Sequence, residues 1–439
     1  MENMKSSTRP ETIEYPGRVR AWCVVALLLV AYTVALVDRQ VLSLMVKPIR
    51  AALSVTDTQL SLLAGFAFVL FYTGLGLPCG RLADTTNRRN LIVAGMILWS
   101  IATVACGLAS TFGELFLARM LVGVGEATLG PAAYSLIADH FPPGPRAKAV
   151  SVYTMGVFMG TGSALMFSAA AVALTAGQSE VTVPLLGSLQ PWQAAFVVVG
   201  LPGLAVAALI ALGVREPARH EASDTGNSLR AAVSFVRGNA GILSPMLIGF
   251  ALNGLINYGL TTWVATLFIR LHGWSAGAIG STYGAILVLF GSAGVLVGGW
   301  LGSRVPPTGS GTVRIARNAL ACIIPVLALL SATTSPWIDL VALSILAFLI
   351  GIPAALSPVA LYQVTPNAFR GQIIAFYLLG ATVLGLGVGV TLIAVATDHL
   401  FHDDQAIGWS LGVVLVPAAA LAVFALDRAR RELEKRAGS

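Results

Sequence analysis

Twelve apolar stretches, each 19–29 residues long, divide the sequence and limit what it can fold into. A helix rises 1.5 Å per residue, so about 20 apolar residues cross the roughly 30 Å hydrocarbon core of a bilayer. Only 11% of the 439 residues are charged, whereas soluble domains carry about 25%. The sequence therefore predicts an all-α polytopic membrane protein. The predicted spans are 22–46, 59–80, 90–110, 112–138, 148–176, 192–213, 242–269, 275–302, 315–333, 337–362, 371–397 and 408–426.

The basic residues predict how these spans are oriented. If the amino terminus is cytoplasmic, the inside regions hold 22 of the 27 Lys and Arg residues, as the positive-inside rule requires. Both termini are then cytoplasmic. The predicted parts are a tail at 1–21, a six-helix bundle at 22–213, a cytoplasmic linker at 214–241, a second six-helix bundle at 242–426 and a tail at 427–439.

Two weak internal repeats support a duplicated six-helix unit. The loop after the second span reads GRLADTTNRR at 80–89, and GWLGSR at 299–304 follows the eighth span. The loops after the fourth and tenth spans carry Arg146 and Arg370 at corresponding places. Parallel halves of this kind are related by an axis along the membrane normal. In the linker, Leu229, Val233 and Val236 have the i, i+4, i+7 spacing of a short amphipathic helix on the inner surface.

Four charged residues lie inside predicted spans. Asp38 and Arg39 are in the first span, and Arg119 and Glu126 are seven residues apart on one face of the fourth. Each costs about 2.5–3.5 kcal/mol at the centre of a membrane helix, so such residues usually serve a function. Asp38 and Glu126 are candidate proton carriers, and Arg39 and Arg119 are candidate binders of an anionic group. The alternative is a neutralising network that only holds the first and fourth helices together.

The loop at 80–89 resembles the signature loop of the major facilitator superfamily, and the resemblance extends over the whole chain through the twelve spans and the repeat. It departs from the usual pattern at Thr85 and Asn87. The resemblance implies that this loop latches the cytoplasmic ends of the two halves. The residues assigned to this cytoplasmic gate are Gly80, Asp84, Arg88, Arg89 and Arg146.

Within that superfamily the chain is similar to the Spinster branch of lysolipid and sphingolipid transporters. The residues that carry the similarity are Asp38 and Arg39, the stretch 84–89 (DTTNRR), the stretch 119–127 (RMLVGVGEA) and the stretch 137–142 (IADHFP). The similarity implies alternating-access transport of an amphipathic lipid, driven by a proton gradient without a cofactor. We also expect a monomeric multi-pass protein of the inner (plasma) membrane of a bacterium.

Further polar residues are candidates for substrate binding. Asn253 and Asn257 share a face of the seventh span, with Tyr258 beside them, and Tyr377 lies in the eleventh span. Interhelical hydrogen bonds or interior packing explain these residues equally well. The outer loop that holds His399, His402 and Asp398, Asp403 and Asp404 is interpreted as a solvated loop rather than a metal site.

Other functions have less support in the sequence. The same charges would serve a proton-coupled transporter of small organic anions or drug-like compounds. A membrane receptor or an intramembrane enzyme is also compatible with the composition. However, the sequence lacks GxxxxGK[ST], GxSxG and HExxH motifs, which argues against nucleotide-driven transport and against hydrolase chemistry. We therefore expect a transporter, not an enzyme, with a lipid or small-molecule substrate and no nucleic-acid partner.

Overall fold

The computed structural model describes residues 15–175, 180–183, 186–218, 229–306, 309–366 and 369–438, which are almost entirely helical. The helices (η marks π- and 3₁₀-helical segments) are α1 Arg18–Leu44, α2 Val46–Leu53, α3 Asp57–Ser61, η1 Leu62–Phe66, α4 Ala67–Thr85, α5 Arg88–Cys106, α6 Phe112–Glu126, α7 Leu129–His140, α8 Pro143–Thr175, α9 Pro191–Gly213, α10 Leu229–Gly238, α11 Ala240–Leu271, α12 Ala276–Ile286, η2 Leu287–Gly291, α13 Ser292–Ser303, α14 Ser310–Ala332, α15 Pro336–Val364, α16 Arg370–Thr382, η4 Val383–Gly389, α17 Val390–Val395, η5 Ala396–Phe401, η6 Asp404–Ala406 and α18 Ile407–Gly438. Strands β1 Val181–Val183 and β2 Gly187–Leu189 pair antiparallel in the loop between α8 and α9.

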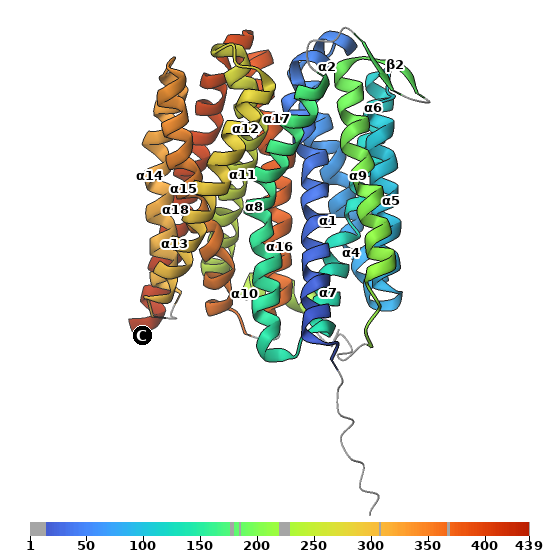
Figure 1. Ribbon diagram of the computed structural model, residues 1–439. Helices are drawn as coiled ribbons and strands as arrows, with labels where there is room; N and C mark the ends of the chain where they lie inside the picture. Colours follow the sequence, from blue (N-terminus) through green and yellow to red (C-terminus); the bar gives the residue numbers. More distant parts are fainter. Residues whose placement is uncertain are drawn as a thin grey trace, which may run out of the picture.

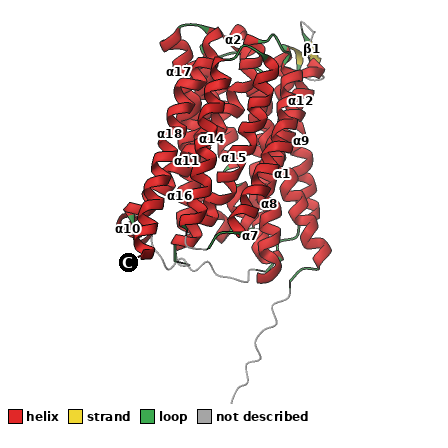
Figure 2. Cartoon of the chain, turned by 90° about the vertical axis from the view of Figure 1, so that its left-hand side faces the viewer, coloured by secondary structure: helices red, strands yellow, loops and turns green. Residues whose placement is uncertain are grey.

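The twelve predicted spans are present as long apolar helical runs. Eleven runs are long and apolar enough to cross a membrane within the described residues, and α8, with its apolar part at 159–174, supplies the fifth span. Figure 1 shows α1 and α4 to α9 on one side and α11 to α18 on the other, with α8 beside the second group. Figure 2 shows the helices running roughly parallel from one end of the molecule to the other. The all-helical twelve-span fold is therefore as predicted.

Two predicted spans are interrupted by prolines. The first helix ends at Leu44 rather than at residue 46, and α2 starts after Met45. The fourth span is divided into α6 and α7 at residues 127 and 128. Pro48 and Pro131 lie in the first turns of α2 and α7, where proline is tolerated, but neither can donate to the carbonyl four residues earlier. A lost backbone hydrogen bond accompanies each break, although Pro245 and Pro417 lie inside continuous helices.

The two halves touch each other in the middle and outer parts of the molecule. A Cβ added to Gly162 of α8 would lie 2.5 Å from the carbonyl oxygen of Gly284 in α12, so these helices pack backbone to backbone. In the same way, a Cβ on Gly65 of η1 would collide with the carbonyl oxygen of Leu386 in η4. Eleven residues, or about three turns, place Gly76 on nearly the same face as Gly65, yet a Cβ there meets no atom within 4 Å. The halves therefore diverge toward the cytoplasmic end of α4.

Candidate functional site

A buried ion pair joins the first and fourth spans. Arg39 of α1 donates from Nε to Glu126 Oε2 at 2.8 Å, and its Nη2 donates to the same oxygen. The Glu126 side chain is 1% exposed and that of Arg39 is 14% exposed. Because both groups are largely removed from water, each depends on the other for compensation of its charge.

Asp38 and Arg119 complete what we call the buried charge cluster: Asp38, Arg39, Arg119 and Glu126. Asp38 Oδ2 accepts a hydrogen bond of 3.0 Å from the hydroxyl of Thr103 in α5. Arg119 of α6 donates to the backbone carbonyl of Asp38 at 3.2 Å. Asp38 and Arg119 are each only 1% exposed. The cluster therefore ties together three helices of the first half.

Several atoms of this cluster lack a hydrogen-bond partner. Within the described part of the chain, Asp38 Oδ1, Arg119 Nε and Glu126 Oε1 are buried and unpaired. An unsatisfied buried polar group costs about 1–3 kcal/mol, and more when charged. Such cost in one place is unusual for a purely structural network, and each free oxygen is a place where a proton can bind.

Aromatic rings flank the guanidinium group of Arg39. Its Cζ lies 4.2 Å from the ring centroid of Phe68 and 5.2 Å from that of Tyr72, and the two rings stack with centroids 5.0 Å apart. Cation–π contacts of this kind contribute about 0.5–2 kcal/mol. They hold the guanidinium group in place on the side that faces α4.

The pairing differs from the simplest expectation for two adjacent opposite charges. Arg39 contacts Glu126 in place of its neighbour Asp38 because consecutive residues of a helix point about 100° apart. The sequence identified all four residues of the cluster but missed Thr103. A threonine in an apolar helix carries no signal of its own, because its hydroxyl commonly bonds to its own backbone.

The candidate substrate-binding residues of the second half make contacts of their own, apart from the buried charge cluster. Asn253 is buried, and its Nδ2 donates to the carbonyl of Ile350 in α15 at 3.4 Å, which is the interhelical hydrogen bond that the sequence left open. Asn257, Tyr258 and Tyr377 are half-buried. A role of these four residues in substrate binding stays a prediction.

At the cytoplasmic end, Arg88 binds residues of its own half. Its Nε lies 2.7 Å from Glu216 after α9, and its Nη1 contacts Asp139 and the hydroxyl of Ser135, both in α7. The backbone amide of Arg89 donates to Glu216 at 3.1 Å. This cytoplasmic motif fastens α5, α7 and the end of α9 together.

The remaining gate candidates are less constrained. A Cβ added to Gly80 would meet nothing within 4 Å. The side chains of Asp84 and Arg146 lie outside the described residues. The predicted latch between the two halves therefore stays a prediction.

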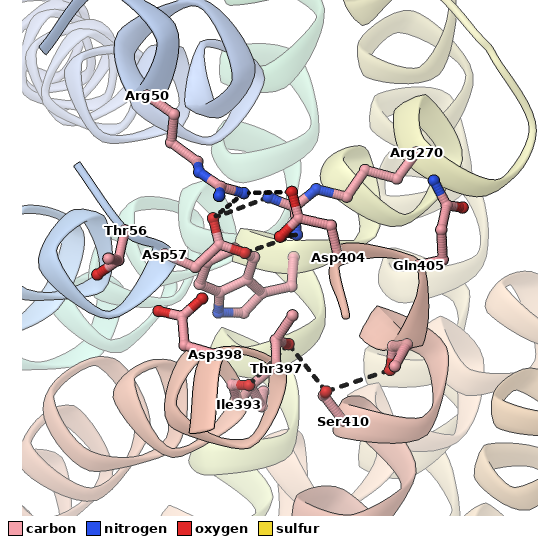
Figure 3. A network of polar contacts seen from close by, with 12 residues as sticks. Arg50, Thr56, Asp57, Arg270, Ile393, Thr397, Asp398, Asp404, Gln405 and Ser410 are labelled. Atoms are coloured by element: carbon pink, nitrogen blue, oxygen red, sulfur yellow. Dashed lines mark hydrogen bonds and ion pairs between the residues drawn. The ribbon is translucent and has the colours of Figure 1, made fainter. Parts of the chain in front are cut away.

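At the opposite end, four charged residues connect the halves (Figure 3). Arg270 at the end of α11 binds Asp57 of α3 through two hydrogen bonds of 2.6 and 2.8 Å. Arg50 of α2 lies 3.2 Å from Asp57 and 2.7 Å from Asp404. We call Arg50, Asp57, Arg270 and Asp404 the outer network. Because Asp57 is fully buried, this network holds the outer ends of the halves together.

The outer loop is more than a solvated loop. Asp398 Oδ2 accepts hydrogen bonds from the amide and hydroxyl of Thr58, at 2.6 and 2.7 Å. Carboxylate oxygens of Asp57, Asp398 and Asp404 lie within 4.8 Å of one another, a spacing that a metal ion could bridge. Arginines or hydrogen-bond donors already engage all three carboxylates, so they are better explained as parts of the contact between the halves.

The fold and the buried charge cluster define a class of protein: a polytopic membrane transporter. The chain belongs to the Major Facilitator Superfamily, whose sequence profile matches residues 28–390. It is therefore a multi-pass membrane protein and a secondary transporter of a small molecule, and not an enzyme.

Individual relatives cover almost the whole chain. An MFS-type efflux pump of Mycolicibacterium smegmatis is 27% identical over 92% of this chain and 91% of its own length. The hexuronate transporter of Bacillus subtilis is 24% identical over 92% of each chain. A crystal structure of a bacterial homologue of the human lysosomal transporter Spinster, inward-facing and unoccupied, is 25% identical over 95% of this chain and 98% of that chain, with a TM-score of 0.77. The predicted similarity to Spinster-type transporters is thus confirmed.

Proposed function

We propose that the protein is a proton-coupled secondary transporter of a lysolipid or sphingolipid, an anionic or zwitterionic amphipathic lipid. The observation that carries the proposal is the buried pair of Arg39 and Glu126, next to Asp38 and Arg119 in the first half. The protein would act as a monomer in the inner membrane of a bacterium.

Proton binding would be coupled to substrate binding because Glu126 and the substrate headgroup compete for the guanidinium group of Arg39. When Glu126 is ionised it occupies Arg39. A proton bound to Glu126 removes the negative charge, and Arg39 is then free to bind an anionic headgroup with its planar set of donors. Asp38, with one unpaired oxygen, is a second proton acceptor. Because these acids interact, the protons belong to the cluster as a whole.

The surroundings of Arg39 suit an amphipathic substrate. Phe68 and Tyr72 offer apolar faces beside the cation, so a headgroup at Arg39 would have its chain along aromatic surface. The wall of the substrate site on the side of the second half would be formed by Asn253, Asn257, Tyr258 and Tyr377.

Transport would proceed by alternating access of the bundles 22–213 and 242–426. The outer network closes the outer side in this structure. In the state that is open to the outside, the cytoplasmic side would be closed by a contact between the halves. That contact would be formed by Gly80, Asp84, Arg88, Arg89 and Arg146.

A second candidate is a proton-coupled transporter of small organic anions or drug-like compounds. It is favoured by two relatives that match over 92% of the chain, an efflux pump and a hexuronate transporter. Arg39 and Arg119 would bind a carboxylate as readily as a phosphate.

Proteoliposomes that contain the purified protein test the proposal. We expect a proton gradient to drive movement of a labelled lysophospholipid or sphingoid phosphate. Asp38→Asn and Glu126→Gln should abolish the gradient-driven part, whereas Glu434→Gln, on the exposed end of α18, should not. If hexuronates or dyes are transported and lipids neither move nor compete, the second candidate replaces the first.

A further inference from the structure

A basic pocket opens on the outer face between the two halves. It has a volume of about 550 Å³, within the range of small-molecule sites. Its lining includes three cationic side chains, Lys47, Arg50 and Arg270, and one carboxylate, Asp404. Figure 3 shows Arg50 and Arg270 approaching from opposite sides, from the first and second halves.

A second, apolar pocket adjoins this basic pocket. It has a volume of about 280 Å³, and Lys47 and Ile269 line both pockets. Its other walls come from α1, α2, α8, α9, α11 and α12 and their ends, among them Met45, Trp192 and Trp274. The two pockets together thus have a charged part and an apolar part that meet at Lys47.

Lys47 is the cation that is available to a ligand. Arg270 is engaged by Asp57, and Arg50 by Asp57 and Asp404. Among the described residues, Lys47 has no carboxylate within ion-pair distance, and its side chain is exposed. Of the two other carboxylates nearby, Asp57 is buried and Asp398 is held by Thr58, so neither lines the pocket.

We propose that these pockets form an outer binding site for a single-chain anionic lipid. Lys47 and Arg50 would bind the phosphate or carboxylate of the headgroup, and the apolar pocket would take the first part of the chain. One chain fits the small apolar volume better than the two chains of a bilayer phospholipid. The evidence for this site comes from the outer face alone. The site can therefore exist whether or not the buried charge cluster binds lipid.

The site has a consequence for opening. A headgroup that binds Arg50 competes with Asp404, which lies 2.7 Å from that guanidinium group. Occupation would therefore weaken one contact between the halves. Arrival of the ligand would in this way favour opening of the outer side.

The test is binding to the full-length protein in nanodiscs. The probe is lysophosphatidic acid with a photoreactive group in its chain, and its attachment points are mapped by mass spectrometry. We expect saturable attachment near Met45 and in the segment 269–276. Lys47→Ala should weaken binding about tenfold, the value of one charge-assisted contact, and Ala276→Trp should weaken it by filling the apolar pocket. Lys435→Ala, which removes an exposed lysine at the cytoplasmic end of α18, is the matched control and should bind normally.

Three competitors distinguish the chemistry. Monoacylglycerol of the same chain length, inorganic phosphate and two-chain phosphatidic acid should each compete at least tenfold less well. Equal competition by any of them, equal loss in Lys47→Ala and Lys435→Ala, or attachment only elsewhere overturns the site. Arg119→Ala, in the buried charge cluster, should leave attachment at the outer site intact. If the wild-type protein binds lipid at the outer site but does not transport it, the proposed function fails and the outer site stands.

Discussion

Glu126 offers a single oxygen to two nitrogens of Arg39, while its other oxygen is buried without a partner. Burying an ion pair costs desolvation of both groups, and removing one partner leaves the other charge uncompensated. We expect Glu126→Leu and Arg39→Met to destabilise the protein by about 3–5 kcal/mol each. The double variant should lose less than the sum, measured as thermal unfolding in one detergent.

The exposed pair of Glu432 and Lys435 in α18 gives the matched comparison. Surface pairs contribute about 0–1 kcal/mol, so Lys435→Met and Glu432→Leu should change unfolding little. Additive losses for Arg39 and Glu126 would mean that the two residues do not stabilise each other in the membrane-embedded protein.

The limits of sequence-based prediction are visible at individual residues. Charges inside spans stand out because they are costly, so all four members of the buried charge cluster could be predicted. Their partners could not, because Glu126 is 87 positions from Arg39 and Thr103 is 65 from Asp38. Asp57 was missed because a helix that begins Thr56-Asp57 looks like an ordinary capped start. The signal available was the exception to the positive-inside rule at Lys47, Arg50 and Arg270.

At the scale of helices, the contact between η1 and η4 depends on glycine. A Cβ at Gly65 would collide with the backbone of Leu386, whereas Gly76, three turns along nearly the same face, has open space. We expect Gly65→Ala to separate the halves at this point and to reduce transport by at least tenfold. Gly113→Ala, at an exposed position in the first turn of α6 where a Cβ meets nothing within 4 Å, should be near wild type. Transport by reconstituted protein, with protein amounts matched by folding in detergent, is the measurement.

The result for Gly65→Ala shows whether transport needs the close approach of the two halves at this point. If both variants transport equally well, the halves do not need to approach this closely during the cycle. If Gly65→Ala fails to fold, Gly162→Ala tests the same idea between α8 and α12, where its Cβ would lie 2.5 Å from Gly284.

Elements could be predicted more completely than their ends. Span number and position follow from hydropathy, because only helices satisfy their own backbone in lipid. The breaks beside Pro48 and Pro131 could not be predicted, because a count of apolar residues does not register them and other prolines, such as Pro245, lie inside continuous helices. The packing of Gly65 against Leu386 joins positions 321 residues apart, and no local pattern encodes it.

At the scale of the whole molecule, we expect the outer network to hold the outer side closed. Asp57 lies 2.6 Å from Arg270 and 3.2 Å from Arg50, whereas Asp404 is 2.7 Å from Arg50 but 3.9 Å from Arg270. Asp57→Asn therefore leaves Arg270 without its close carboxylate partner. The cost of about 3–5 kcal/mol corresponds to more than a hundredfold change in the equilibrium between outer-closed and outer-open states. We expect the outer side to open, which allows water to solvate the arginines.

Spin labels at Ala51 in α2 and Gln405 in η6 measure this opening, because both residues line the basic pocket from different halves. The wild type should give mainly one short distance, and Asp57→Asn should add a longer one as the major population. Asp403→Asn is the control, since the side chain of Asp403 caps the turn at Gln405 within its own half. If Asp57→Asn leaves the distance distribution unchanged, the ion pairs are not needed to keep the outer side closed. Packing contacts such as that of Gly65 with Leu386 would then close it. In that case the outer network forms because the outer side is closed, and does not cause the closure.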